Sequence, residues 1–175
     1  MDILNYRTRD GKMSEVAIMF GRFNPPHFGH VAAWEDMSKK FPHWFVGTNK
    51  STQGPKDPLP FKIKIQAMET FMPSVREHLV AEQNWWSLAT LAYSKYGESV
   101  TLHIVTDEKD AKIFVPGIKK YNGVQGAHGY YKFKDVVWHK AVRASEASKV
   151  RKAVVDNNPE AFSAAAGVPA ETLFA

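Results

Sequence analysis

The chain has 175 residues, of which 44% are hydrophobic and 23% are charged, as is ordinary for a soluble globular protein of one domain. It contains no cysteine, which excludes disulfides and thiolate metal sites, and no apolar run is long enough to cross a bilayer. The formal net charge of +5 favours anionic partners such as nucleotides and phosphates, but without a long basic run nucleic acid is not expected to be the partner.

Strands and helices are predicted to alternate along the chain after a polar N-terminal arm, residues 1–14. Apolar runs predict strands at 16–20, 43–48, 77–82, 99–107 and 134–139. Periodic apolar spacing predicts helices at 30–41, 59–72, 84–97 and 145–157. The segment 108–130 is rich in glycine and is expected to be irregular.

This alternation predicts an α/β fold, a Rossmann-like parallel sheet with helices on both faces. The domain is expected to span 15–157, followed by a small helical tail at 158–175. In such folds ligands bind at the carboxyl ends of the strands. The turn that follows the first strand therefore lies at the expected ligand edge.

That turn is the stretch MFGRFNPPHFGH, residues 19–30, and its backbone is suited to an anion. Gly21 lets the chain leave the strand with little side-chain obstruction, and Asn24-Pro25-Pro26 predicts a tight turn. Gly29 allows close approach near the helix start. The N–H groups and the dipole of a helix N-terminus favour a phosphate there.

The side chains of the stretch allow three interpretations. His27 and His30 are three residues apart, so they can share one face of a helix. A metal pair would need a third ligand, and no nearby acid or histidine repeats the spacing. Either histidine could instead be structural. With Arg22, a fork donor suited to phosphate oxygens, the pair could also stabilise charge on a phosphoryl centre.

The string GRFNPPHFGH resembles the HxGH signature of the nucleotidylyltransferase superfamily, which shares its fold with class I aminoacyl-tRNA synthetases. The match over 27–30 is complete. The upstream residues that also fit the family's turn are Gly21, Phe23, Asn24, Pro25 and Pro26. The resemblance covers about residues 15–162 and is strongest to short bacteriophage-encoded members and to nicotinamide-nucleotide adenylyltransferases.

Two further segments resemble family motifs. The segment DPLPFKIKIQAM (57–68) is similar to a motif that opens with Asn-Pro and leads to a basic helix residue, with Asp57 in place of the usual Asn and Lys64 where Arg is commoner. The segment SEASKVRKAV (145–154) is similar to the C-terminal motif that binds the triphosphate, although Glu146 and Ala147 depart from it.

The resemblance implies transfer of a nucleoside monophosphate, most simply AMP, from an NTP to a small phosphate-bearing acceptor, with Mg²⁺ bound to the NTP and pyrophosphate released. It implies catalytic roles for His27, His30 and Lys64. The residues that it implies in nucleotide binding are Phe20, Gly21, Arg22, Phe23, Asn24, Gly29, Ser148, Lys149 and Arg151. Asp107, at the end of another strand, is assigned to the second substrate, and a simple turn acid is an equal alternative.

The other functions that the sequence leaves open are a cytidylyltransferase acting on a phosphorylated alcohol, a phosphate- or nucleic-acid-binding module, and a virion-associated protein with a relict site. ATP or CTP is the expected nucleotide. The N-terminus has no apolar core of a signal peptide, so we expect a cytoplasmic protein, located in the host cytoplasm if phage-encoded. The sequence leaves open whether the chain forms a homo-oligomer.

Overall fold

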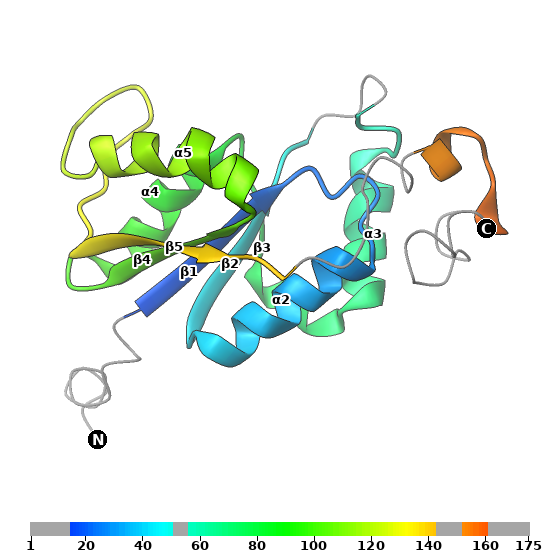
Figure 1. Cartoon of the computed structure of the whole chain (residues 1–175), viewed down its shortest axis with the longest axis horizontal. Helices are drawn as coiled ribbons and strands as arrows, with labels where there is room; N and C mark the ends of the chain where they lie inside the picture. Colours follow the sequence, from blue (N-terminus) through cyan, green and yellow to red (C-terminus); the bar gives the residue numbers. More distant parts are fainter. Residues whose placement is uncertain (1–14, 51–55, 143–151, 161–175) are drawn as a thin grey trace.

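In the computed structural model, which describes residues 15–50, 56–142 and 152–160, five parallel strands form one sheet (Figure 1). Their order is β3-β2-β1-β4-β5. The strands are β1 (Glu15–Gly21), β2 (His43–Thr48), β3 (Leu79–Ala81), β4 (Thr101–Thr106) and β5 (Asp135–Lys140). In the centre of the sheet Val16 of β1 pairs with His43 of β2 on one side and with Leu102 of β4 on the other. The predicted fold class is confirmed.

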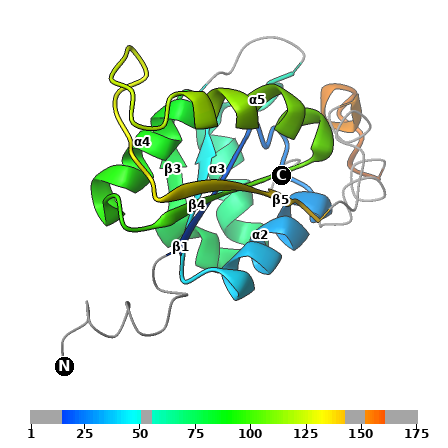
Figure 2. The same cartoon turned by 60° about the vertical axis from the view of Figure 1, so that its left-hand side comes forward.

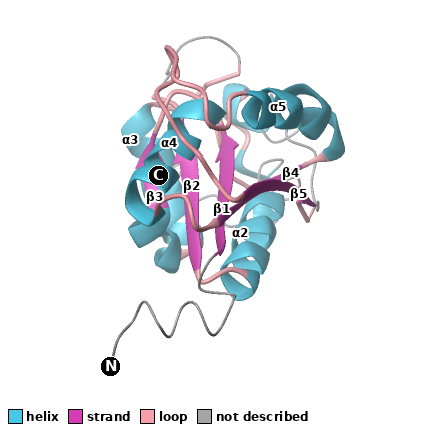
Figure 3. Ribbon diagram, turned by 90° about the vertical axis from the view of Figure 1, so that its left-hand side faces the viewer, coloured by secondary structure: helices cyan, strands magenta, loops and turns pink. Residues whose placement is uncertain are grey.

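Helices cover both faces of this sheet, and Figure 2 shows α5 and α2 on opposite sides of it. The helices are α2 (Phe28–Lys40), α3 (Phe61–Phe71), α4 (Trp85–Tyr96) and α5 (Glu108–Lys120), with a 3₁₀ helix η2 (Pro73–His78) before β3. Figure 3 shows the strands enclosed between the helical layers. Among the described residues no helix has the length and apolar character needed to cross a membrane.

Alternate residues of β1 point into two separate cores. Val16 and Ile18 pack with α4 and α5, while Ala17 and Met19 pack with α2 and α3. Because both faces of the strand are covered, its apolar run is continuous rather than alternating. Fully burying one such aliphatic side chain contributes about 1.5–3 kcal/mol. The central strand is thereby fixed on both sides, and so is the turn that follows it.

The prediction that 108–130 is irregular is wrong for its first half, which forms α5. Ala111, Val115 and Ile118 lie on one face of this helix and are buried. Pro116 stands inside α5, where it cannot donate a hydrogen bond to the preceding turn. Burial of the apolar face outweighs this loss, and only the stretch between α5 and β5 is irregular.

Other boundaries differ by small amounts. The helix predicted from residue 30 begins at Phe28, because His27 acts as its N-cap. The strand predicted over 77–82 is the shorter β3, since η2 occupies its start. Of the helix predicted over 145–157, residues 145–151 lie outside the described residues, and 152–155 are helical.

Candidate active site

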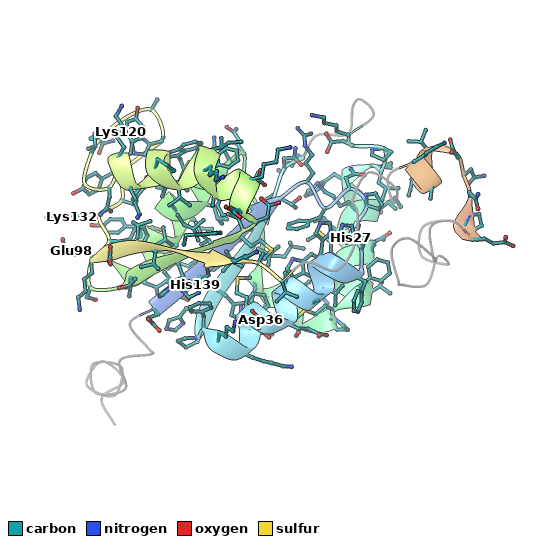
Figure 4. All side chains as sticks on the ribbon, viewed as in Figure 1. His27, Asp36, Glu98, Lys120, Lys132 and His139 are labelled. Atoms are coloured by element: carbon teal, nitrogen blue, oxygen red, sulfur yellow. The ribbon has the colours of Figure 1, made fainter. Side chains whose placement is uncertain are left out.

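A cavity of about 600 Å³ opens at the carboxyl ends of β1 and β4, where α2 and α5 begin. Residues of the 19–30 stretch form one wall, and residues around β4, α4 and α5 form the other. Those contributed by the stretch are Met19, Phe20, Gly21, Arg22, Phe23, Asn24, Pro25, His27, Gly29 and His30. In Figure 4 His27 lies far from Lys132 and Glu98, which mark the other end of the sheet. The cavity therefore occupies the predicted ligand edge.

Phe23 shapes the turn between β1 and α2. Its ring makes edge contacts with His30, at 4.7 Å between centroids, and with Trp34, at 5.3 Å. Its backbone has a φ of 45°, which is uncommon for a residue other than glycine. A Cβ on Gly21 would lie 2.9 Å from the same ring. Gly21 is therefore needed here because Phe23 folds back over it.

The turn is held from the side by Asn24. Its Nδ2 donates to the Leu59 carbonyl oxygen at 2.9 Å, and its Oδ1 accepts from the Leu59 backbone N–H at 2.7 Å. Asn24 is buried, and its peptide bond to Pro25 is cis. The oxygen and the nitrogen of the Asn24 amide thus both bond to the backbone of a residue 35 positions away. These two hydrogen bonds attach the turn to the segment before α3.

The two histidines cap α2 reciprocally. The Nδ1 atom of His27 accepts from the Gly29 backbone N–H at 3.1 Å, and the Nδ1 atom of His30 accepts from the His27 backbone N–H at 3.2 Å. The rings stack with 3.6 Å between their centroids. Because an accepting ring nitrogen carries no proton, the neutral form of each ring carries its proton on Nε2. The cap therefore makes both Nε2 atoms hydrogen-bond donors.

Arg22 and Lys64 place two cations around the same turn in different ways. Arg22 lines the cavity, its side chain is 47% exposed, and its Nη1 lies 2.7 Å from Oδ2 of the buried Asp57. Lys64 does not line the cavity. Its Nζ donates to the Arg22 carbonyl oxygen at 2.9 Å, to Thr48 Oγ1 at 2.9 Å and to the Asn49 carbonyl oxygen at 2.7 Å.

These contacts make Lys64 a support of the turn backbone. The side chain is fully buried. Burial lowers the pKa of Lys64 to about 8, against the opposing effect of the Asp57 carboxylate. The neighbouring Arg22 charge lowers the pKa further. Contact between Lys64 and a bound phosphate would require this network to rearrange.

Two acids stand on the opposite wall of the cavity. Asp107 follows β4 and caps α5, its Oδ1 accepting from the Asp110 backbone N–H at 2.7 Å. Both residues line the cavity. Burial, with the Asp107 charge as a second cause, raises the pKa of the Asp110 carboxyl above its usual range. Across the described part of the chain no three histidine or acidic side chains are grouped to hold a metal ion.

The structure thus brings most of the predicted site residues to one cavity. Phe20, Gly29 and Asp107 line it together with the turn, whereas Lys64 lies behind it. Ser148, Lys149 and Arg151 lie outside the described residues. Other lining residues were not predicted from the sequence, among them Asn84, Asp110 and Phe114. The i, i+3 spacing of Asp110 after Asp107 was the available signal for one of them.

Comparisons with known proteins place this geometry in context. The family model described as cytidylyltransferase-like matches residues 18–153. None of the curated protein sequences compared with the chain matches it significantly.

Several solved structures are similar in fold. One is a bifunctional NMN adenylyltransferase/ADP-ribose pyrophosphatase from Francisella tularensis, with a TM-score of 0.59 and 15% identity over 82% of this chain. The same Francisella protein complexed with AMP and a manganese ion gives a TM-score of 0.57 at 14% identity, again over 82% of this chain. This chain spans only 42% of the length of the Francisella protein. A Vibrio parahaemolyticus protein assigned as a nicotinate-nucleotide adenylyltransferase gives a TM-score of 0.55 at 14% identity over 85% of this chain and 92% of its own.

Proposed function

The chain belongs to the cytidylyltransferase-like family, and we propose that it is a nucleotidyltransferase that moves a nucleoside monophosphate from an NTP to a small phosphate-bearing acceptor. The observation that carries the proposal is the reciprocal cap of α2. It makes the Nε2 atoms of His27 and His30 hydrogen-bond donors, and both histidines line the same cavity as Arg22. Donors and a cation held in place in this way suit a phosphoryl centre, which gains charge as it reacts.

The proposed reaction needs no protein nucleophile. A phosphate oxygen of the acceptor attacks the α-phosphorus of the NTP, a new P–O bond forms, and the bond to the oxygen that bridges the α- and β-phosphates breaks. The electron pair of that bond leaves with pyrophosphate. His27 and His30 stabilise the charge that develops on the leaving group, and Arg22 orients the phosphates.

Three components complete the proposal: the metal ion, the residues that hold the β- and γ-phosphates, and the contact with the acceptor. Mg²⁺ would accompany the NTP on its phosphate oxygens and neutralise part of their charge, and Asp107 and Asp110 are carboxylates of the cavity that could supply further oxygen ligands. Ser148, Lys149 and Arg151 remain candidates for holding the β- and γ-phosphates. Asp107 remains the candidate for contact with the acceptor.

AMP transfer is the preferred form of the reaction. The GRFNPPH sequence resembles nicotinamide-nucleotide adenylyltransferases, and two of the similar folds belong to proteins described as adenylyltransferases. The family description favours the second candidate, transfer of CMP to a phosphorylated alcohol. Both candidates use the same donors and differ in the base and in the acceptor.

A pyrophosphate-release screen tests the proposal. Each NTP, with Mg²⁺, is paired with nicotinamide mononucleotide, phosphopantetheine, glycerol phosphate or choline phosphate. We expect one pair to release pyrophosphate, and His30→Ala to lower kcat by about 10²- to 10³-fold, as removal of a positioned donor does elsewhere. The matched control is His78→Ala, since His78 stacks on Trp44 and does not line the cavity.

Two results would contradict the proposal. Activity that survives His30→Ala would remove that imidazole from the chemistry. Nucleotide binding with no pyrophosphate from any pair would indicate a binding protein with a relict site.

A further inference from the structure

One buried carboxylate stands behind the cation that faces the cavity. Asp57 is 2% exposed and does not line the cavity, whereas Arg22 lines it with a side chain that is 47% exposed. The contact between them is a single hydrogen bond, from Nη1 to Oδ2 at 2.7 Å. Asp57 is therefore placed to fix the guanidinium from the protein side while leaving the other face of that group open to solvent.

The Arg22 fork is only partly used by this contact. A guanidinium has five N–H donors, and within the described residues the Arg22 side chain makes only the hydrogen bond to Asp57. Oδ1 of Asp57 is buried and makes no hydrogen bond to any described residue. A two-pronged carboxylate contact would occupy the fork, whereas this single bond leaves donors for a phosphate.

The charge of the same carboxylate also acts on Lys64. Lys64 is fully buried and donates to the backbone oxygen of Arg22 itself and to that of Asn49. The Asp57 charge counteracts the effect of burial on the pKa of Lys64. One carboxylate therefore acts on two cations. Lys64 is buried and holds the turn backbone, and Arg22 is half-exposed and lines the cavity.

We propose that Asp57 is a positioning residue of the phosphate-binding turn, whose carboxylate holds the Arg22 guanidinium at the mouth of the cavity for the triphosphate. The inference rests on the proposed function and assigns a role in it to Asp57. The related family motif has an asparagine at this position, and an amide cannot balance two cations. Asp57 does not line the cavity, so it acts on a bound phosphate through Arg22 rather than by direct contact.

Two effects of opposite sign make the inference testable. A carboxylate near a phosphate site repels the anion, so on charge alone its removal strengthens anion binding. Loss of positioning has the opposite effect, because Arg22 must then be ordered by the ligand. Ordering a flexible side chain weakens binding by about three- to tenfold.

The experiment is a double-mutant cycle on the full chain, with inorganic tripolyphosphate as the probe and the Kd measured by calorimetry. We expect Asp57→Asn to raise the Kd about three- to tenfold, although it removes a negative charge. In an Arg22→Ala background we expect the same change to leave the Kd unchanged or to lower it. The matched control is Glu98→Gln, because Glu98 pairs with Lys132 at an exposed site far from His27 (Figure 4).

Two measurements keep the test independent of folding defects. Arg22→Lys keeps Asp57 and the positive charge but loses the forked guanidinium. We expect it to weaken tripolyphosphate binding to the same degree as Asp57→Asn does. In the unliganded protein, NMR titration of the Lys64 side chain should give a lower pKa in Asp57→Asn than in the wild type, because the carboxylate that raises it is gone.

Three outcomes would overturn the inference. Asp57→Asn that binds tripolyphosphate as tightly as the wild type, or more tightly, would leave Asp57 with a repulsive role only. Equal weakening in the presence and absence of the Arg22 side chain would show that Asp57 does not act through it. A wild-type chain that binds neither tripolyphosphate nor any NTP would overturn the proposed function as well.

Discussion

The buried Lys64 makes the stability of this protein depend on pH in a direction opposite to that of most lysines. Its pKa is lowered from 10.5 to about 8 in the folded protein. At pH 7 the charged side chain therefore costs about 3 kcal/mol relative to the unfolded chain, at about 1.36 kcal/mol per unit of pKa difference. The unfolded chain binds more protons between these pKa values, so stability rises as the pH rises through them.

The size of this effect follows from the same two pKa values. At about pH 10 only about 1 kcal/mol of the cost remains, so the wild type should gain about 2 kcal/mol between about pH 7 and about pH 10 from this group. Tyr131, whose pKa is raised by burial, acts in the opposite direction as the unfolded phenol begins to ionise. Its contribution is the same in a Lys64 variant and cancels when the two proteins are compared.

The assay is urea unfolding followed by circular dichroism, at several values from about pH 7 to about pH 10. Lys64→Met removes the titration, so the difference in the free energy of unfolding, wild type minus variant, should grow by about 2 kcal/mol over this range. Lys112→Met, at an exposed lysine of α5, is the control and should show no such growth. A difference that stays flat for Lys64→Met would refute a lowered pKa and the buried ammonium on which the support of the turn depends.

Two further predictions concern contacts that stabilise the fold. Asn24→Ala removes both hydrogen bonds to the Leu59 backbone and should lower the free energy of unfolding by about 2–4 kcal/mol, measured by urea unfolding, whereas a loss under about 1 kcal/mol would contradict the tie. Burial lowers the pKa of His103 and that of His139 below 6.5, so the unfolded chain takes up protons first and stability should fall as the pH drops below about 6.5. His139→Gln removes one of the two titrating groups and should make that fall shallower, and an equally steep fall in the variant would exclude His139, which lies 2.7 Å from His103 between ring nitrogens, as a contributor.

The fold could be predicted because its strands are recognisable from short stretches of the sequence. A strand covered on both faces needs a continuous apolar run, and β1 and β2 each have one, whereas the run of β4 is interrupted by His103. The prediction of an irregular segment in place of α5 was wrong because Pro116 and the glycines of 108–130 outweighed the spacing of its buried residues. Whether this segment forms a helix is decided by the burial of its apolar face against the sheet. A local sequence pattern does not show that burial.

The cavity could be predicted in part for the same reason. The 19–30 stretch is contiguous, so the sequence places its histidines, arginine and glycines at one strand end. Contacts that join distant segments could not be predicted. Arg22 and Asp57 are 35 residues apart, and Lys64 reaches the Arg22 carbonyl oxygen across 42 residues. Their pairing depends on how α3 docks beside β1, and this follows from packing rather than from any motif.

The HxGH spacing has a physical reason in the cap of α2. A side-chain acceptor at the N-cap and a second one three residues later satisfy two backbone N–H groups of the first turn. Serine, aspartate or asparagine would cap α2 as well as His27 does, and they are the commoner choices. An imidazole that accepts through Nδ1 carries its proton on Nε2, at the far side of the ring. The cap alone therefore does not explain the choice of two histidines, and under the proposed function their Nε2 protons are donated to the phosphates of the nucleotide.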